Sequence, residues 1–271
     1  LGDVYKRQDK HYVLSDKEYP VVFEYAGQEV ATVHINVNDG NEIPNELIYG
    51  TIKGYKVNRE TGDKISGALF GLFRADETSF TEANALLTAE SGEDGVFTFE
   101  NVVYGNYTVR ELRPAAGYLE NETVYAVTVD KDDDVVEITV VNDLIPEIGT
   151  TAAIDDEKEV CATEVFTLTD TVEYKHLVPG KKYTVKGILM DKATGEPFLQ
   201  NGEQITSEVT FVPEAPSGSV EVLFTFDAKL IKTDTSIVVF ESLYSDSKEL
   251  TVHADIEDDE QTVTVIVPEI K

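Results

Sequence analysis

Hydrophobic and polar residues alternate with a period of two along most of the chain, which is the spacing of β-strands with one face in a core. Between residues 49 and 144 the alternation recurs in TIKGYKVN, GVFTFENV, NYTVREL, YAVTV and VEITVVN. Between residues 145 and 267 it recurs in VFTLTDTVEY, KYTVKGILM, SVEVLFTF, SIVVFESLY and QTVTVIV. Turn signals such as ETGDK, GEDG and VPGKK separate these segments. The pattern predicts an all-β chain of tandem β-sandwich domains.

Internal repeats predict where the domains begin and end. NELI and NDLI each close one strand-rich block, so that Asn45 takes the place that Asn142 takes later, and VPEIK at the end of the chain echoes IPEIG. The first residues lack the alternation and read as a non-native or disordered leader, and both ends suggest a piece of a longer array. We expect five parts: the leader at 1–10, the remnant of a preceding sandwich domain at 11–48, one domain at 49–144, a second at 145–267, and the start of a further repeat at 268–271.

Composition limits the classes of partner and the kinds of cross-link. The formal net charge of −30, from 52 acidic against 22 basic residues, disfavours nucleic acid and anionic membrane surfaces as partners. The single cysteine, Cys161, cannot form an internal disulfide. The sequence contains no run of about 18 apolar residues, the length that would predict a membrane-spanning helix. Any covalent stabilisation of these domains must therefore use other chemistry.

The block 49–144 carries KVNRETGDKISGALFGLF, then DGVFTFENVVYGNYTVRELRPAAGY, and finally ITVVN. Together these segments resemble the collagen-adhesin B-type (SpaA-like) domains of Gram-positive surface proteins and pilins. The resemblance implies an Ig-like or prealbumin-like β-sandwich in which a first-strand lysine and a last-strand asparagine join in an intramolecular isopeptide bond, helped by an acid. By their place in the motif these residues are Lys56, Asn142 and Glu111.

The alternation supports these assignments, because each of the three residues continues an inward-facing apolar row of its strand. Burial disfavours charge, so we expect a neutral Lys56 amine and a protonated Glu111 that donates a hydrogen bond to the amide oxygen of Asn142. A neutral amine can attack the carboxamide and release ammonia. The alternative is a buried ion pair of Lys56 and Glu111, with Asn142 as a turn cap.

The block 145–267 carries PEIGTTA, DTVEYKHLVPGKKYTVKGILMDKATGEP, VVFESLY and HADIEDDEQTV. Together these segments resemble the VaFE-type ester-bond repeats of Gram-positive surface-anchored adhesins. The resemblance implies a side-chain ester between a first-strand threonine and a last-strand glutamine, assisted by a histidine and two acids. The residues at these motif positions are Thr150, Gln261, His253, Asp170 and Glu241.

The chemistry of a hydroxyl explains why this second motif includes a histidine. A hydroxyl is too weakly acidic to attack an amide unaided, so His253 would act as its base, with one acid paired to it and the other polarising the carboxamide oxygen. Which acid takes which role stays open. Thr150 lies on the apolar face of its strand, which favours it over Thr151 as the nucleophile.

Two alternatives concern the acidic segment HADIEDDEQ. It could be a solvated loop, or its Asp255, Asp258 and Asp259 could bind calcium, although their spacing matches no EF-hand loop. We expect no metal and no cofactor.

The two resemblances imply a structural stalk module of an extracellular, cell-wall-anchored adhesin or pilus-like protein of a Gram-positive bacterium. Its isopeptide and ester bonds would form once, without turnover, so the chain would not be an enzyme. The expected partners are neighbouring domains of the same surface protein. A domain that binds a host surface or matrix ligand is the main alternative, and a hydrolase built on Thr150 and His253 is a third hypothesis.

Overall fold

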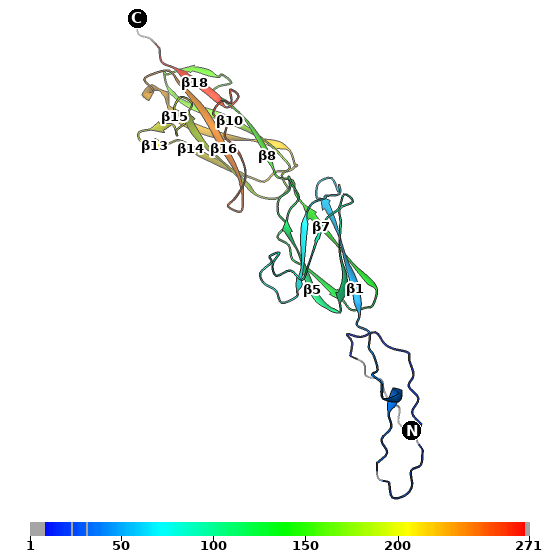
Figure 1. Cartoon of the computed structure of the whole chain (residues 1–271). Helices are drawn as coiled ribbons and strands as arrows, with labels where there is room; N and C mark the ends of the chain where they lie inside the picture. The colour runs from blue at the N-terminus through cyan, green and yellow to red at the C-terminus, as the bar shows by residue number, and fades with distance from the viewer. Residues whose placement is uncertain (1–8, 23, 31, 269–271) are drawn as a thin grey trace. The chain divides into compact units, whose positions relative to one another are not determined.

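The computed structural model describes residues 9–22, 24–30 and 32–268. The chain divides into two compact units, the first ending at Asn142 and the second beginning at Asp143. Each unit contains a β-sandwich (Figure 1), so the predicted all-β fold is confirmed. Most of the expected leader and of the expected repeat start, at 1–8 and 269–271, lies outside the described residues.

Residues 9–48 have little regular structure in the part that is described. Tyr12 and Leu47 form an isolated antiparallel bridge, and the N–H of Val13 donates to the carbonyl of Glu46 at 2.8 Å. The 3-10 helix η1 (Val37–Gly40) lies between these two paired segments in the sequence. The described residues of this block contain no longer strand and form no sandwich, and its origin in a preceding domain stays a prediction.

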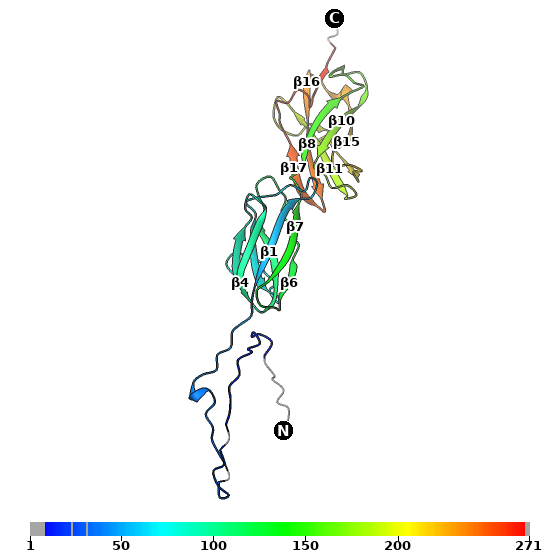
Figure 2. The ribbon, with the colours of Figure 1, turned by 90° about the vertical axis from the view of Figure 1, so that its right-hand side faces the viewer.

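The sandwich of the first unit consists of a three-stranded sheet, ordered β4-β1-β7, and a four-stranded sheet, ordered β3-β2-β5-β6. The first and last strands pair in parallel, from Gly50 opposite Asp134 to Asn58 opposite Asn142 (Figure 2). Both strands therefore end at the same pole of the domain. The strands are β1 (Tyr49–Asn58), β2 (Leu69–Arg74), β3 (Leu87–Glu90), β4 (Val96–Val103), β5 (Gly105–Arg113), β6 (Tyr125–Val129) and β7 (Asp134–Asn142).

The core between these sheets contains a lysine. Every second residue of β1 is buried, which places Ile52, Gly54 and Lys56 on the inner face. Gly54 is needed there, because a Cβ atom would lie 1.9 Å from the ring of Phe97. The Phe97 ring stacks on that of Phe70 with 3.7 Å between centroids, and the Lys56 amine lies 5.5 Å from the centroid of Phe70. The stacked aromatic rings thus form the apolar side of the pocket that holds the amine.

The second unit is a sandwich of a three-stranded sheet, ordered β15-β10-β8, and a larger sheet, ordered β14-β11-β16-β18-β9 with β17 also paired to β16. A short hairpin, β12-β13, and the 3-10 helix η2 (Ala228–Leu230) complete it. The strands are β8 (Glu147–Ala153), β9 (Glu159–Cys161), β10 (Val165–Lys175), β11 (Tyr183–Asp191), β12 (Leu199–Gln200), β13 (Glu203–Gln204), β14 (Thr206–Phe211), β15 (Gly218–Asp227), β16 (Thr235–Ser245), β17 (Lys248–His253) and β18 (Thr262–Ile266).

The first strand of this sandwich, β8, contacts the residues that lead into its last strand, β18. The N–H of Ala152 donates to the carbonyl of Glu260 at 3.0 Å. The Lys158 amine donates to the carbonyl of Ala152 at 2.6 Å and also to the carbonyl of Glu260. Thr150 and Gln261 lie next to this junction and are both buried. The fold therefore brings the two ends of the domain together at the predicted ester site.

Candidate cross-linking sites

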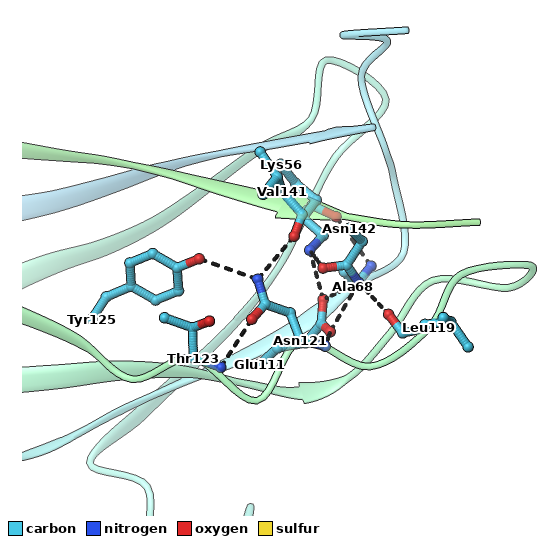
Figure 3. A network of polar contacts seen from close by, with 10 residues as sticks. Lys56, Ala68, Glu111, Leu119, Asn121, Thr123, Tyr125, Val141 and Asn142 are labelled. Atoms are coloured by element: carbon cyan, nitrogen blue, oxygen red, sulfur yellow. Dashed lines mark hydrogen bonds and ion pairs between the residues drawn. The ribbon is translucent and has the colours of Figure 1, made fainter. Parts of the chain in front are cut away.

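Lys56, Glu111 and Asn142 meet in the core of the first sandwich, near the pole where β1 and β7 end (Figure 3). The three residues, from β1, β5 and β7, are each at most 2% exposed. Lys56 Nζ lies 2.8 Å from Glu111 Oε1 and donates a hydrogen bond to Asn142 Oδ1. An amine, an acid and a carboxamide are thus in direct contact away from water.

The Asn142 carboxamide has a defined orientation in this cluster. Its Nδ2 donates to both carboxylate oxygens of Glu111, each at 3.0 Å, and to the carbonyl of Leu119 at 2.8 Å. Its oxygen faces Lys56. The sequence interpretation placed the acid against the amide oxygen, and that detail is wrong, because Glu111 contacts the amide nitrogen. Glu111 therefore lies between the amine and the nitrogen that would leave as ammonia.

The connection between β5 and β6 adds two contacts that sequence reasoning missed. The carbonyl of Leu119 accepts from Asn142, and the backbone N–H of Asn121 donates to Glu111 Oε2 at 2.8 Å. Both are backbone groups, so no residue type at these positions gives a signal of the contact. Together they hold the leaving nitrogen and the acid from one loop.

Thr150, Gln261 and Glu241 are in contact in the core of the second sandwich. Gln261 Nε2 donates to Thr150 Oγ1 at 2.8 Å and to Glu241 Oε2 at 2.9 Å. Thr150 is 5% exposed and the other two at most 1%, whereas Thr151 is exposed to solvent. The acid again contacts the carboxamide nitrogen and not its oxygen, as in the first domain. The hydroxyl of Thr150 is therefore in hydrogen-bond contact with the group that it would attack.

Asp170, on β10 beside Thr150, forms a buried acid pair with Glu241. Burial raises the pKa of Glu241 to about 10, and the neighbouring Asp170 adds to the shift. Burial also raises the pKa of Asp170, against the lowering effect of Glu241 and of the Thr150 hydroxyl. Among the described residues no donor has good hydrogen-bond geometry to either Asp170 oxygen or to Glu241 Oε1. A proton on Glu241 supplies a donor between the two acids, and the raised pKa of Glu241 keeps that proton in place at neutral pH.

His253 stands opposite Glu241 on the neighbouring strand β17, which also lies against β8. Its Nε2 is 3.2 Å from Asp258 Oδ2, while Asp258 Oδ1 accepts from the N–H of Glu260 at 2.8 Å. The sequence interpretation considered Asp170 and Glu241 as the partner of the histidine, but the structure pairs it with Asp258. Nδ1 of His253 is buried and has no hydrogen-bond partner among the residues that the structure describes.

The acids proposed as an alternative calcium site have other partners. Asp258 pairs with His253, and Asp259 lies 3.2 Å from the Lys192 amine. Within residues 9–22, 24–30 and 32–268, no three His, Cys, Asp or Glu side chains are grouped so that they could hold a metal ion. The described chain also contains no helix long and apolar enough to cross a membrane.

Comparison with known families agrees with this division. A model of the SpaA family, described as a prealbumin-like fold domain, matches residues 50–144, and a model of the T-Q ester bond containing domain matches residues 146–265. Each of the two domains thus matches one family model. The two resemblances noted in the sequence are thereby confirmed. We refer to the domains as the SpaA domain and the T-Q domain.

Solved structures similar to the chain include surface proteins of several bacteria. A Mobiluncus mulieris adhesin containing disulfide, isopeptide and ester cross-links is 19% identical with a TM-score of 0.40, covering 45% of this chain and 57% of the adhesin. The major pilin subunit BcpA of Bacillus cereus is 17% identical with a TM-score of 0.48, covering 80% and 69%. The group B streptococcus pilus 2b backbone protein is 26% identical with a TM-score of 0.31, covering 40% and 47%. The chain thus spans little more than half of the adhesin. A comparison with curated proteins finds no match.

Proposed function

We propose that the chain is a structural stalk module of a Gram-positive surface adhesin or pilus-like protein, in which each sandwich closes itself with one covalent bond. The SpaA domain would form an isopeptide bond between Lys56 and Asn142, and the T-Q domain an ester between Thr150 and Gln261. One observation carries the proposal: in each domain a first-strand nucleophile contacts a buried carboxamide at the last strand, and an acid contacts the nitrogen that would leave.

In the SpaA domain the acid serves both ends of the reaction. Glu111 takes a proton from the Lys56 amine, which leaves a neutral nucleophile in a dry core where separated charges are costly. Nζ attacks Cγ of Asn142, Glu111 gives its proton to Nδ2, and the bond from Cγ to Nδ2 breaks so that ammonia leaves. Glu111 then takes a second proton from Nζ, which keeps one hydrogen in the new amide. Contact between the groups before reaction replaces an encounter in solution and supplies a large effective concentration.

In the T-Q domain the weaker nucleophile requires a base. We assign this role to His253, because its buried Nδ1 has no hydrogen-bond partner among the described residues and would be available to take the Thr150 proton, while Asp258 at Nε2 would stabilise the imidazolium. Oγ1 attacks Cδ of Gln261, the bond from Cδ to Nε2 breaks, and the histidine returns the proton to the departing ammonia. Glu241 accepts a hydrogen bond from that nitrogen and orients it.

A load-bearing role follows from where the bonds lie. Each bond joins the first strand of a domain to its last, so tension applied to the ends passes through the bond before it reaches the remaining strands. Extending a domain past its bond then requires breaking a covalent bond, so the bond would stabilise the domain mainly by slowing its unfolding. The extracellular surface is the location that this role suggests, and the net charge of −30 favours a soluble, well-hydrated stalk.

Peptide mapping of the full chain tests both bonds. Trypsin cannot cleave after a lysine whose amine is acylated, so we expect a branched peptide that joins Lys56 to Asn142 and a second that joins Thr150 to Gln261. Hydroxylamine at alkaline pH should release only the second, because esters yield to it and amides do not. The Lys53→Ala chain, altered on the outer face of the same strand, should keep both branches. Recovery of linear peptides with intact Asn142 and Gln261 would refute the proposal.

A further inference from the structure

The connection between β5 and β6 holds two of the groups that take part in the proposed isopeptide reaction. The Leu119 carbonyl accepts from Asn142 Nδ2, and the Asn121 N–H donates to Glu111 Oε2, each at 2.8 Å. These two backbone groups lie two residues apart. The position of this loop therefore sets both the direction of the leaving nitrogen and the rotation of the acid.

The side chain of Asn121 fixes that loop to the sheet. Its Nδ2 donates to the carbonyl of Val141 at 2.8 Å and to the Tyr125 hydroxyl at 3.1 Å, and its Oδ1 accepts from the N–H of Thr123 at 2.9 Å. Figure 3 shows the carboxamide of Asn121 between these groups, beside the reacting cluster. Val141 immediately precedes Asn142 in β7, so one side chain ties the loop to the strand that carries the electrophile.

We propose that Asn121 is a positioning residue for isopeptide formation in the SpaA domain. Its side chain hydrogen-bonds to Val141, Tyr125 and Thr123, and it acts by keeping the acid and the leaving nitrogen aligned with the amine. Without the tie to Val141, the loop can shift relative to β7, and Glu111 and Asn142 lose their fixed geometry together. Misplacement by about 1 Å can slow a positioned reaction by about a hundredfold. The inference rests on the proposed isopeptide bond.

The chain offers a matched control in Asn106. Its Oδ1 accepts from the Thr128 hydroxyl at 2.9 Å, so this asparagine also links the β5 and β6 segments, but on the exposed surface. Asn106→Ala removes the same kind of side chain from β5 and breaks a hydrogen bond to β6 away from the reacting cluster. Asn121→Asp is nearly isosteric and keeps the acceptor for Thr123, yet it cannot donate to Val141.

The test follows bond formation in full chains made by cell-free synthesis, carrying Thr150→Ala so that only the SpaA reaction changes the mass. After synthesis is stopped, intact mass at successive times gives the rate at which ammonia is lost. We expect Asn121→Ala and Asn121→Asp to slow that loss by about ten- to a hundredfold, and Asn106→Ala to leave it within about twofold. All three variants should in the end lose one ammonia and carry the same bond between Lys56 and Asn142.

A second measurement separates positioning from folding. Thermal unfolding of the same variants in a Lys56→Ala chain, which cannot react, gives the temperature below which each is folded, and the rates are compared only there. A wild-type rate in either Asn121 variant, at a temperature where it is folded, overturns the inference while the isopeptide bond stands. If the chain with native Asn121 never loses ammonia, and so keeps its calculated mass over time just as the Lys56→Ala chain does, the proposed function itself fails.

Discussion

Loss of either proposed bond should release a defined length of chain under tension. In the SpaA domain, force that enters β1 leaves the strand at Lys56, crosses the bond and exits from Asn142 at the end of β7. Residues 57–141 would therefore bear no load while the bond is intact. In the T-Q domain the same reasoning removes residues 151–260 from the load path.

The sequence separations of the bonded residues give the size of the effect. Lys56 and Asn142 are 86 positions apart, and Thr150 and Gln261 are 111 apart. At about 3.3–3.6 Å per extended residue, Lys56→Ala should expose about 280–310 Å of chain and Thr150→Ala about 370–400 Å.

Single-molecule force spectroscopy with handles at the two ends measures these lengths directly. The native chain should show neither step below the force that breaks covalent bonds, and each variant should show only its own step. Lys53→Ala, on the outer face of β1, should behave as the native chain does. A native chain that yields a step of about 280–310 Å at ordinary unfolding forces would refute the reasoning for the SpaA domain.

Three further predictions concern the groups around the bonds. Asn142→Asp turns the donor that faces the Leu119 carbonyl into an acceptor, so bond formation should slow at least about tenfold. The reaction should then release water, a loss of about 18 Da that intact mass can follow over time. An unchanged rate would contradict the observed carboxamide orientation. Glu241 has a folded pKa of about 10 against an ordinary value of 4.5, so its stabilising effect is complete below pH 4.5 and is lost as pH rises towards 10. In a Thr150→Ala chain, denaturant titrations should show the ratio of folded to unfolded protein falling by up to about tenfold per pH unit in that window. Glu241→Gln should make this ratio depend less on pH. An equal pH dependence in both chains would count against a proton held on Glu241. Asp258→Ala should slow ester formation about a hundredfold or more without changing the isopeptide rate, measured by timed intact mass, and equal ester rates would exclude Asp258 as the partner of the base.

The fold could be predicted from the sequence because alternation of residue types determines which face of a strand is buried. β1 shows this most clearly, since Ile52 and Lys56 share the inner face as the period of two requires. Thr150 and Thr151 were separated by the same rule, and the structure places them in the core and in solvent respectively.

Other features of the sites could not be read from residue types. The contacts of Leu119 and Asn121 with the reacting groups use backbone atoms, which every residue has. Asp258 lies in an acidic loop where neighbouring aspartates look equivalent in sequence, and only the path of the loop brings it to His253. The orientation of each carboxamide depends on acceptors from distant segments, which is why the acids were expected at the oxygen and not at the nitrogen.

The central claim is that a nucleophilic side chain in each sandwich has displaced ammonia from a buried carboxamide. The intact mass of the full chain tests it most directly, since each bond removes about 17 Da. The account predicts a chain about 34 Da lighter than the sum of its residues, with Lys56→Ala and Thr150→Ala each restoring about 17 Da relative to its own calculated mass. A native chain that weighs as much as its unmodified residues would contradict the account.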